Sequence, residues 1–239
     1  MVDALLRDLA DCPQVSRVIL TVNVSEDEPI PPEPLSGRIT VLRNLIPKGF
    51  GANHNTAFAH CDTPYYCVLN PDIRLDGNPF PALLDCLGAD VALCAPAVVS
   101  PTGEVEDSAR RFPGFLNLLA KLLGLADGRY HYEKNGELFH PEWVAGMFML
   151  FVSADYAALS GFDEDYFLYY EDVDLCVRLW RSGRKIVLCP RAQVIHAAQR
   201  ASHHDLRHLA WHLASMLRYF IRHWGRLPSV GTNSGKRLF

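Results

Sequence analysis

The sequence predicts an α/β protein with a mostly parallel central sheet, helices on its faces and a helix near the C-terminus. Short apolar segments alternate with helical segments through the first hundred residues, which is the pattern of strands joined by helical connections. Three acids open an amphipathic run at residue 171, as expected where the unpaired N–H groups of a helix start favour negative charge. Apolar residues at helical spacing return between residues 206 and 224.

The N-terminal half supplies most of the predicted sheet. The predicted strands are Val15–Val22, Arg38–Leu42, Tyr65–Leu69 and Val91–Val98, and the predicted helices are 2–10, a helix after a glycine turn within 48–60, and 79–87. Asn70-Pro71-Asp72 follows the third strand directly. By itself this tripeptide is an ordinary turn, because asparagine and proline both favour turns. Ligands of parallel α/β sheets bind beyond the carboxyl ends of strands, and this turn lies at such an end.

The second half of the chain begins with a less regular stretch. Residues 100–140 include an apolar helix over 115–125, and we interpret this stretch as a mobile insertion near the site. The helix that begins at Glu171 is expected to end at Gly183. A short strand closed by Pro190 and a second apolar run ending in His196 are expected to follow. Acids at a helix start and a histidine at a strand end can converge on one site.

The composition is that of a globular domain. Hydrophobic residues make up 49% and charged residues 21% of the 239 positions, and the net charge is −4. This net charge offers no electrostatic argument for nucleic acid or for an anionic membrane as a partner. The seven cysteines include no C-x-x-C pair and lie mostly in apolar runs, so we expect buried reduced thiols. With no signal peptide and no run of about 20 apolar residues, the prediction is a cytoplasmic protein.

The C-terminal residues form a separate unit in this interpretation. Residues 1–200 are expected to form the main domain, 201–226 an amphipathic helix and 227–239 a disordered tail. We favour a helix packed on the domain. The alternative is a membrane-surface or subunit contact, which would place the protein peripherally at the inner membrane face or make it a homodimer.

The segment from Trp143 to His196 resembles the C-terminal half of family 2 glycosyltransferases, and in particular their bacterial rhamnosyltransferase-like branch. It contains W-x-x-G-x-x-x-L, then GFDEDYFLYYEDVDLCVR, then a tail with glycine, proline and histidine in that order. The resemblance implies a GT-A-like fold and inverting transfer of a sugar from a nucleotide-diphosphate donor. Rhamnose is the best match for the sugar, and a polysaccharide or lipid-linked molecule for the acceptor. It also implies a divalent metal, Mg²⁺ or Mn²⁺.

The resemblance also implies roles for individual residues. Asp172 matches the catalytic base, which accepts the proton of the acceptor hydroxyl. Asp72 and His196 match metal ligands of the oxygen and imidazole type that suit these ions. Donor-site positions are Gly49, Gly51, Asn55, Asn70 and Asp72, and acceptor-side positions are Trp143, Gly146 and Glu171. Asn70 departs from the acidic residue that usually opens the D-x-D-type motif.

Each of these assignments has a plainer structural alternative. A tight strand-to-helix turn would explain Gly49 and Gly51 equally well, although glycine also lets backbone approach an anion closely. Asn55 lies early in a helix, where asparagine is unfavourable unless its side chain makes a polar contact. Core packing is the alternative for Trp143. A lone histidine after an apolar strand is more often a satisfied structural residue than a metal ligand.

The start of the sequence departs from the family pattern. Relatives begin with a strand that this chain lacks, and Val22 stands where the next strand usually ends in an aspartate that faces the nucleotide base. We therefore expect a truncated form with an open edge on the strand Val15–Val22, weak nucleotide binding and pairing with a second copy.

Two other functions remain open at this point. A nucleotidyltransferase would usually show a glycine-rich, basic phosphate signature near the N-terminus, which is not found. A degenerate sugar- or nucleotide-binding module without turnover would be expected to lose acids such as Asp72 and Asp172, which are present.

Overall fold

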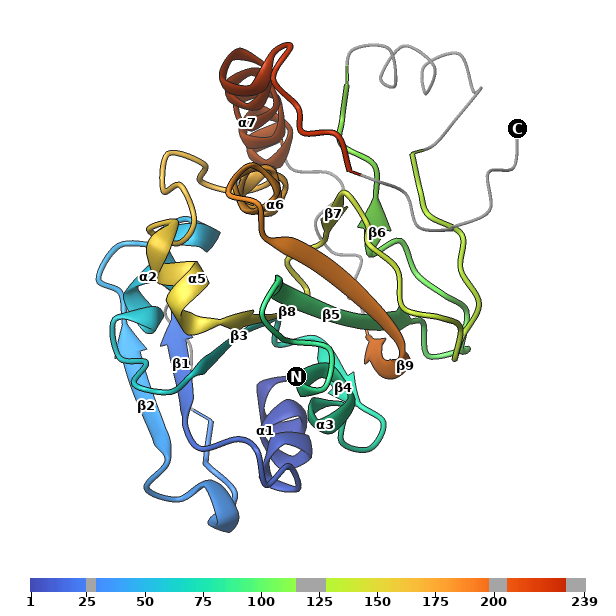
Figure 1. Ribbon diagram of the computed structural model, residues 1–239. Coiled ribbons are helices and arrows are strands. Elements are labelled where there is room, and N and C mark those ends of the chain that lie inside the picture. The colour runs from blue at the N-terminus through green and yellow to red at the C-terminus, as the bar shows by residue number, and fades with distance from the viewer. Residues whose placement is uncertain (25–28, 115–127, 198–205, 231–239) are drawn as a thin grey trace.

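The computed structural model describes residues 1–24, 29–114, 128–197 and 206–230, and it has the predicted α/β class (Figure 1). The predicted helix over 115–125 and most of the predicted C-terminal tail lie outside the described residues. The elements in chain order are α1 (Val2–Ala10), β1 (Val18–Val22), η1 (Glu33–Leu35), β2 (Ile39–Arg43), α2 (Phe50–Phe58), β3 (Tyr65–Leu69), β4 (Ile73–Leu75), α3 (Phe80–Leu84), β5 (Val91–Val99), β6 (Ala109–Arg110), β7 (Trp143–Val144), β8 (Phe148–Val152), α5 (Ser153–Ala158), α6 (Glu171–Arg181), β9 (Lys185–His196) and α7 (Leu206–His223).

The central sheet has five strands in the order β3-β8-β5-β9-β4. Strands β3, β5 and β9 run in one direction, whereas β8 and β4 are antiparallel to their neighbours. Strands β1 and β2 form a separate parallel pair. The sheet is therefore mixed, with its parallel strands supplied by the segments that the apolar runs predicted.

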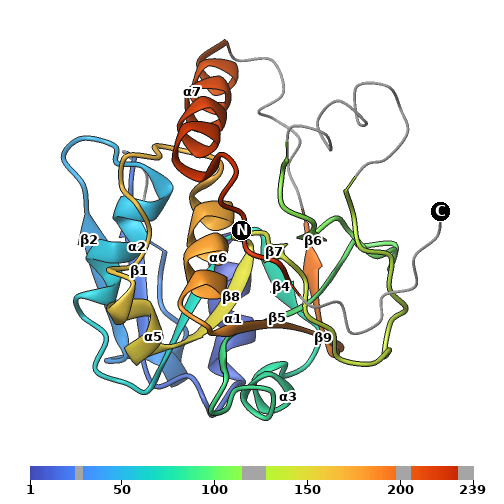
Figure 2. The same cartoon turned by 45° about the horizontal axis from the view of Figure 1, so that its top comes forward.

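Side chains of the central strands pack alternately on the two faces of the sheet, as the strand period of two requires. Leu93 of β5 belongs to the cluster that contains Val177 and Leu179 of α6. The next residue, Cys94, belongs to the opposite cluster with Leu6 of α1. Helix α6 lies over one face, and α1 and α3 lie over the other (Figures 1 and 2). Each face thus has its own hydrophobic core.

Strand β9 corrects the prediction of two short strands separated by Pro190. It is one strand of twelve residues. The register with β5 shifts between Pro96 and Ala97, which pair with Cys189 and Gln193. Pro190 falls within the extra residues of this bulge. A bulge leaves residues outside the hydrogen-bonded ladder, so a proline without an N–H group is tolerated there.

Helix α2 is joined to the loop after α5 by Asn55. Its Oδ1 accepts hydrogen bonds from the Tyr156 hydroxyl at 2.8 Å and from Phe162 N at 3.0 Å. Its Nδ2 donates to Phe162 O and to Glu164 Oε1, both at 2.9 Å. Two donors and two acceptor positions are all that an asparagine side chain has. The polar contacts of Asn55 are therefore made with this loop. They occupy every donor and acceptor position of the side chain, so none is left for a nucleotide. This corrects the predicted donor-site role of Asn55.

Gly49 and Gly51 are explained by the same loop. A Cβ atom at Gly49 would lie 2.6 Å from Phe167 O, and one at Gly51 would lie 2.7 Å from Phe162 Cβ. The N–H of Phe50, at the start of α2, donates to Phe167 O at 2.9 Å. The glycines thus allow close packing of α2 on residues 162–167, and this helix start is already occupied by a carbonyl group. The packing alternative describes both glycines better than phosphate binding.

Gly161 packs against the side chain of Asn55, so a larger residue at this position should destabilise the fold. Its φ is +65°, and a Cβ atom there would lie 2.2 Å from Asn55 Oδ1. We expect Gly161→Ala to lower the free energy of unfolding by more than the ~1–3 kcal/mol of backbone strain alone, because it also displaces Asn55. Gly77→Ala is the matched control, since Gly77 has φ +81° but nothing within 4 Å of the added atom. Equal losses in urea denaturation would show that the Asn55 contact contributes nothing.

Candidate active site

The turn before α6 adopts a costly backbone conformation. Tyr169 and Tyr170 have φ values of +71° and +66°, a region that residues other than glycine rarely occupy and that costs about 1–3 kcal/mol for each residue. Such a conformation persists only where its surroundings hold it. Here it directs Glu171 and Asp172, the first two residues of α6, toward the segment between β7 and β8.

Asp172 is held by backbone groups on both carboxylate oxygens. Oδ2 accepts from Gly146 N at 3.0 Å, and Oδ1 accepts from Val173 N at 2.8 Å. Burial raises the pKa of Asp172 above its usual value, although these hydrogen bonds and the nearby Arg110 oppose the shift. A carboxylate with a raised pKa is a stronger proton acceptor than one on the surface, provided that it remains ionised.

Glu171 is the buried neighbour of this carboxylate. Its side chain is only 5% exposed, and Oε2 has no hydrogen-bond partner. Burial, together with the charge of Asp172, raises the pKa of Glu171 to about 8. Glu171 therefore holds a proton at neutral pH, whereas Asp172 accepts two backbone hydrogen bonds, which favour its charged form. A neutral Glu171 removes the repulsion that two adjacent carboxylates would suffer.

Asp72 and His196 lie side by side at the ends of their segments. His196 Nε2 is 3.2 Å from Asp72 Oδ2, and His196 Nδ1 is 2.6 Å from Glu106 Oε2. The hydrogen bond to Asp72, aided by Glu106, raises the pKa of His196 to about 9. The pKa of Asp72 is lowered by the same hydrogen bond. Glu106 was not predicted, because it lies in an irregular loop 90 residues from His196.

One short backbone segment links the two groups of residues. Gly146 N donates to Asp172, and the next residue, Met147, accepts a hydrogen bond from Asn70 N at 3.0 Å. Asp72 follows two residues later, and its carbonyl accepts from Ala197 N, next to His196. Asp172, Asn70, Asp72 and His196 are therefore connected through consecutive backbone contacts beyond the ends of β3 and β9.

Of the predicted acceptor-side residues, Gly146 contacts Asp172 directly. A Cβ atom at Gly146 would lie 3.1 Å from the ring of Phe50 and 3.8 Å from Asp172 Cβ, so a glycine here lets the backbone reach the carboxylate. Trp143, in β7, is partly buried, and its Nε1 donates to Arg111 O at 2.9 Å. The hydrogen bond fixes the indole while leaving part of its ring exposed.

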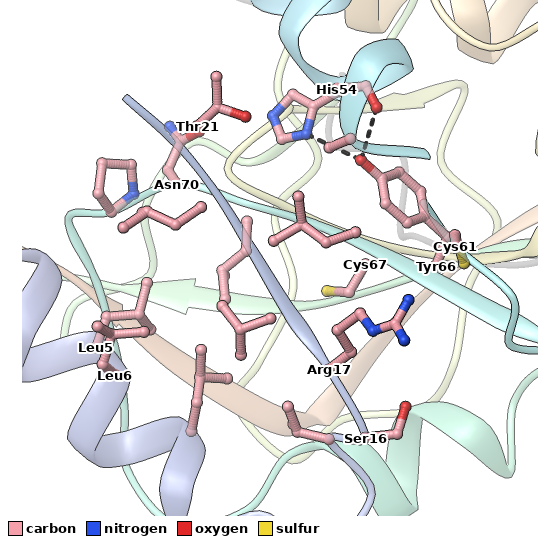
Figure 3. Close-up of a pocket in the computed structure, with 18 of the residues that line it drawn as sticks. Leu5, Leu6, Ser16, Arg17, Thr21, His54, Cys61, Tyr66, Cys67 and Asn70 are labelled. Carbon is pink, nitrogen blue, oxygen red and sulfur yellow. Dashed lines mark hydrogen bonds between the residues drawn. The ribbon is translucent and has the colours of Figure 1, made fainter. Parts of the chain in front are cut away.

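A large cavity adjoins the Asn70 end of this region. It measures about 1260 Å³ and lies between β1 and β3, with α1 at one end (Figure 3). Thr21 and Asn70 line it at one end, and Tyr66 and Cys67 line its middle. Burial lowers the pKa of His54, on its wall, to about 4, so that this wall is uncharged.

The predicted open edge of the first strand faces this cavity. Among the described residues, β1 pairs only with β2, and β3 pairs only with β8. Val22 is buried at the end of β1. The following residue, Asn23, accepts through Oδ1 from Asn44 Nδ2 at 2.8 Å and from Lys48 N at 2.9 Å. These bonds join the ends of β1 and β2 to the segment before α2.

The chemistry of the Asp72 region fits a divalent cation. Asp72 Oδ1 is buried without a hydrogen-bond partner, and the carboxylates of Asp72 and Glu106 both lie against His196, whose pKa they raise. No group of three or more His, Cys, Asp or Glu side chains within the described residues is arranged as a complete metal site. Two protein ligands are sufficient where substrate phosphates supply the others, as is common for Mg²⁺.

Comparison with known proteins identifies the fold. No protein-family model matches the chain. The mannosyltransferase PcManGT from Pyrobaculum calidifontis, solved with GDP-Man and Mn²⁺, superposes with a TM-score of 0.57 at 15% identity, over 91% of this chain and 60% of that one. The fold is therefore that of the GT-A glycosyltransferases, and the predicted fold is confirmed.

Two curated relatives define the family more closely. Rhamnosyltransferase WbbL of Escherichia coli is 32% identical over 192 residues, which are 73% of this chain and 70% of the relative. N-acetylglucosaminyl-diphospho-decaprenol L-rhamnosyltransferase of Mycobacterium tuberculosis is 32% identical over 182 residues, which are 70% of this chain and 59% of the relative. The chain belongs to the rhamnosyltransferase-like branch of the family 2 glycosyltransferases.

The buried Glu171 should make stability depend on pH. Because the folded protein holds a proton up to about pH 8 that the unfolded chain releases near its ordinary pKa, the folded state binds more protons between these values. The free energy of unfolding should therefore fall as pH rises from 5 to 8. We expect Glu171→Gln to abolish much of this fall in denaturation curves at several pH values, whereas Glu137→Gln, at an exposed position, should not. An unchanged pH dependence in Glu171→Gln would contradict the assignment of this proton to Glu171.

Glu106 should act as a positioning residue for His196. We expect Glu106→Ala to weaken donor binding in the presence of Mn²⁺ by about 10- to 100-fold, the usual effect of removing a partner of a metal-ligating histidine. Binding measured by calorimetry without metal should change little. Glu104→Ala is the control, since Glu104 is an exposed acid two residues away. Equal affinities for the two variants would remove Glu106 from the site.

Proposed function

We propose that the chain transfers a 6-deoxyhexose of the rhamnose type from a nucleotide-diphosphate donor to a saccharide on a lipid-linked acceptor, with inversion. The observation that supports this most is Asp172, which is fixed by Gly146 N and Val173 N and connected through Met147 and Asn70 to Asp72. This arrangement separates a proton acceptor from a group suited to bind a charged diphosphate. Both relatives named above are rhamnosyltransferases, and one is named for a diphospho-decaprenol acceptor.

The proposed reaction requires one displacement. The acceptor hydroxyl attacks the anomeric carbon, and Asp172 takes its proton while the bond from the anomeric carbon to the diphosphate oxygen breaks. The product is a glycoside, and the nucleoside diphosphate leaves with the electron pair of the broken bond. No nucleophile of the enzyme intervenes, so the configuration at the anomeric carbon is inverted. The raised pKa of Asp172 assists the proton transfer, and the neutral Glu171 beside it prevents a second charge from competing.

Asp72 and His196 are the residues that would hold a divalent metal, Mg²⁺ or Mn²⁺, with Glu106 orienting His196. When bound, the ion would supply electrostatic stabilisation of the negative charge on the departing diphosphate. Asn70 has its N–H group occupied by Met147 and its carbonyl by Ile73 N. Its side chain is thus held at the rim of the cavity, next to the donor side.

The donor nucleotide is proposed to lie along the ends of β1 and β3. Thr21, Asn53 and Asn70 are polar residues that line the cavity. The acceptor is proposed to approach from the side of Trp143, whose partly exposed ring can stack on a sugar face. With a lipid-linked acceptor, the enzyme would work at a membrane surface. No helix among the described residues is long and apolar enough to cross a bilayer.

Substitution of the two aspartates should separate chemistry from binding. We expect Asp172→Asn to reduce turnover by about 10²–10⁴-fold, the usual contribution of acid–base catalysis, while the affinity for dTDP-rhamnose remains near that of the wild type. Asp72→Ala should instead weaken donor binding in the presence of Mn²⁺. The measurements are product formation on a diphospholipid-linked saccharide and calorimetry with the donor.

Asp165→Asn is the control for both variants, because Asp165 is an exposed acid in the same segment and its carboxylate pairs with Arg218. Its turnover should stay near that of the wild type. Loss of donor binding in Asp172→Asn with normal binding in Asp72→Ala would reverse the two assignments. Absence of transfer from any nucleotide sugar by the wild type would contradict the proposed function.

A further inference from the structure

Helix α7 faces solvent with its leucines. The large apolar residues Leu206, Leu209, Leu213, Leu217, Ile221 and Trp224 are exposed, with values as high as 81% for Leu206 and 75% for Ile221. Their spacing of three or four residues places them in one stripe along the helix. Contiguous exposed apolar surface of this kind marks an interaction site. We call these six residues the apolar stripe.

The orientation of α7 is fixed by the opposite side of the helix, which is polar and aromatic. Ser215, Tyr219 and His223 are its buried residues. Ser215 Oγ donates to Leu168 O at 2.9 Å, and His223 Nε2 lies 2.8 Å from Asp174 Oδ1. A soluble surface helix normally buries its leucines and exposes its polar residues, and here the polar contacts enforce the reverse.

The charge of the helix points to the chemistry of the partner. Residues 206–226 contain four arginines, Arg207, Arg218, Arg222 and Arg226, and no acid, and all four are exposed. The chain as a whole has a net charge of −4, so the positive charge is local. A basic helix with an apolar stripe and a tryptophan near its end has the pattern of a helix that lies in a lipid–water interface.

We propose that α7 docks the protein on an anionic lipid surface, with the apolar stripe inserted among the acyl chains and the arginines near the headgroups. Each arginine near such a surface contributes favourable electrostatic energy. Arg218 pairs with Asp165 and Arg222 pairs with Asp163, so acids outside the helix balance part of its positive charge. Pairing of the stripe with that of a second copy is still less favourable, because a two-fold contact would bring two basic helices together. In Figures 1 and 2, α7 lies at the outer edge of the described chain, beyond α6.

Helix α7 also contacts the turn that Tyr169 and Tyr170 form before α6. Tyr169 OH lies 3.1 Å from His208 Nδ1, and the ring of Tyr170 packs on His212 and Tyr219. A membrane held by α7 would thus lie on the side of the molecule from which Asp172 would receive a lipid-linked acceptor. This consequence rests on the proposed function, whereas the docking surface does not.

The test is sedimentation of the full chain with vesicles of phosphatidylcholine, with or without phosphatidylglycerol. We expect binding to the anionic vesicles to be at least about 10-fold tighter, to weaken in high salt, and to shift tryptophan emission to the blue. The double variant Leu213→Gln/Leu217→Gln should bind at least about 10-fold more weakly. The matched control is Leu45→Gln/Ile46→Gln, which changes two exposed apolar residues outside α7 and should bind as the wild type does.

Three outcomes would overturn the proposal: no preference of the wild type for anionic vesicles, equal binding by the two double variants, or a dimer in light scattering that the α7 variant alone abolishes without any vesicle binding. Turnover on a soluble acceptor analogue is measured separately. An inactive chain that still binds vesicles would refute the proposed function and leave docking intact. An active chain that ignores vesicles would refute docking alone.

Discussion

The left-handed turn of Tyr169 and Tyr170 is the constraint on which the candidate site depends. Two consecutive residues with side chains at positive φ are unfavourable by themselves, so the turn exists because contacts on both sides hold it. Residues of α7 contact Leu168, Tyr169 and Tyr170 from one side. From the other side, Phe50 N donates to Phe167 O. The turn sets the direction in which α6 begins, and that direction brings Asp172 to Gly146.

Asp174 connects this turn to the rest of the fold. It is fully buried, and its carboxylate lies 2.7 Å from Arg178 Nε and 2.8 Å from His223 Nε2. Arg178 also donates to the carbonyls of Leu159 and Gly161. A buried charge is stable only when its partners replace the water that it has lost. One carboxylate thus connects α6, α7 and the loop that Asn55 contacts, and it helps to set the position of the neighbouring Asp172.

The carboxylates of the candidate site differ from one another because their local environments differ. Glu171 has a buried Oε2 without a partner and a raised pKa, Asp172 accepts two backbone hydrogen bonds, and Asp72 is paired with His196. Three carboxylates with similar ordinary pKa values therefore have three different environments. This division matches the needs of glycosyl transfer, in which one group accepts a proton and another region meets a charged diphosphate. The chain's membership of the rhamnosyltransferase-like branch agrees with it.

The sequence by itself determined the class of the fold, because apolar runs and turn residues are local properties. It predicted Tyr65–Leu69 to the residue and α6 from its opening acids to Gly183. It did not predict β4, whose three residues become a strand only by pairing with β9, nor the partnership of Glu106 and His196. The packing of Asn55 and the glycines of α2 on residues 161–167 was also decided by tertiary contacts. The periodicity of 206–224 predicted a helix and its two faces. Only the buried Asp174 and the strained turn decided that the polar face points inward and the leucines point out, because polar contacts to a buried charge outweigh the burial of one apolar stripe.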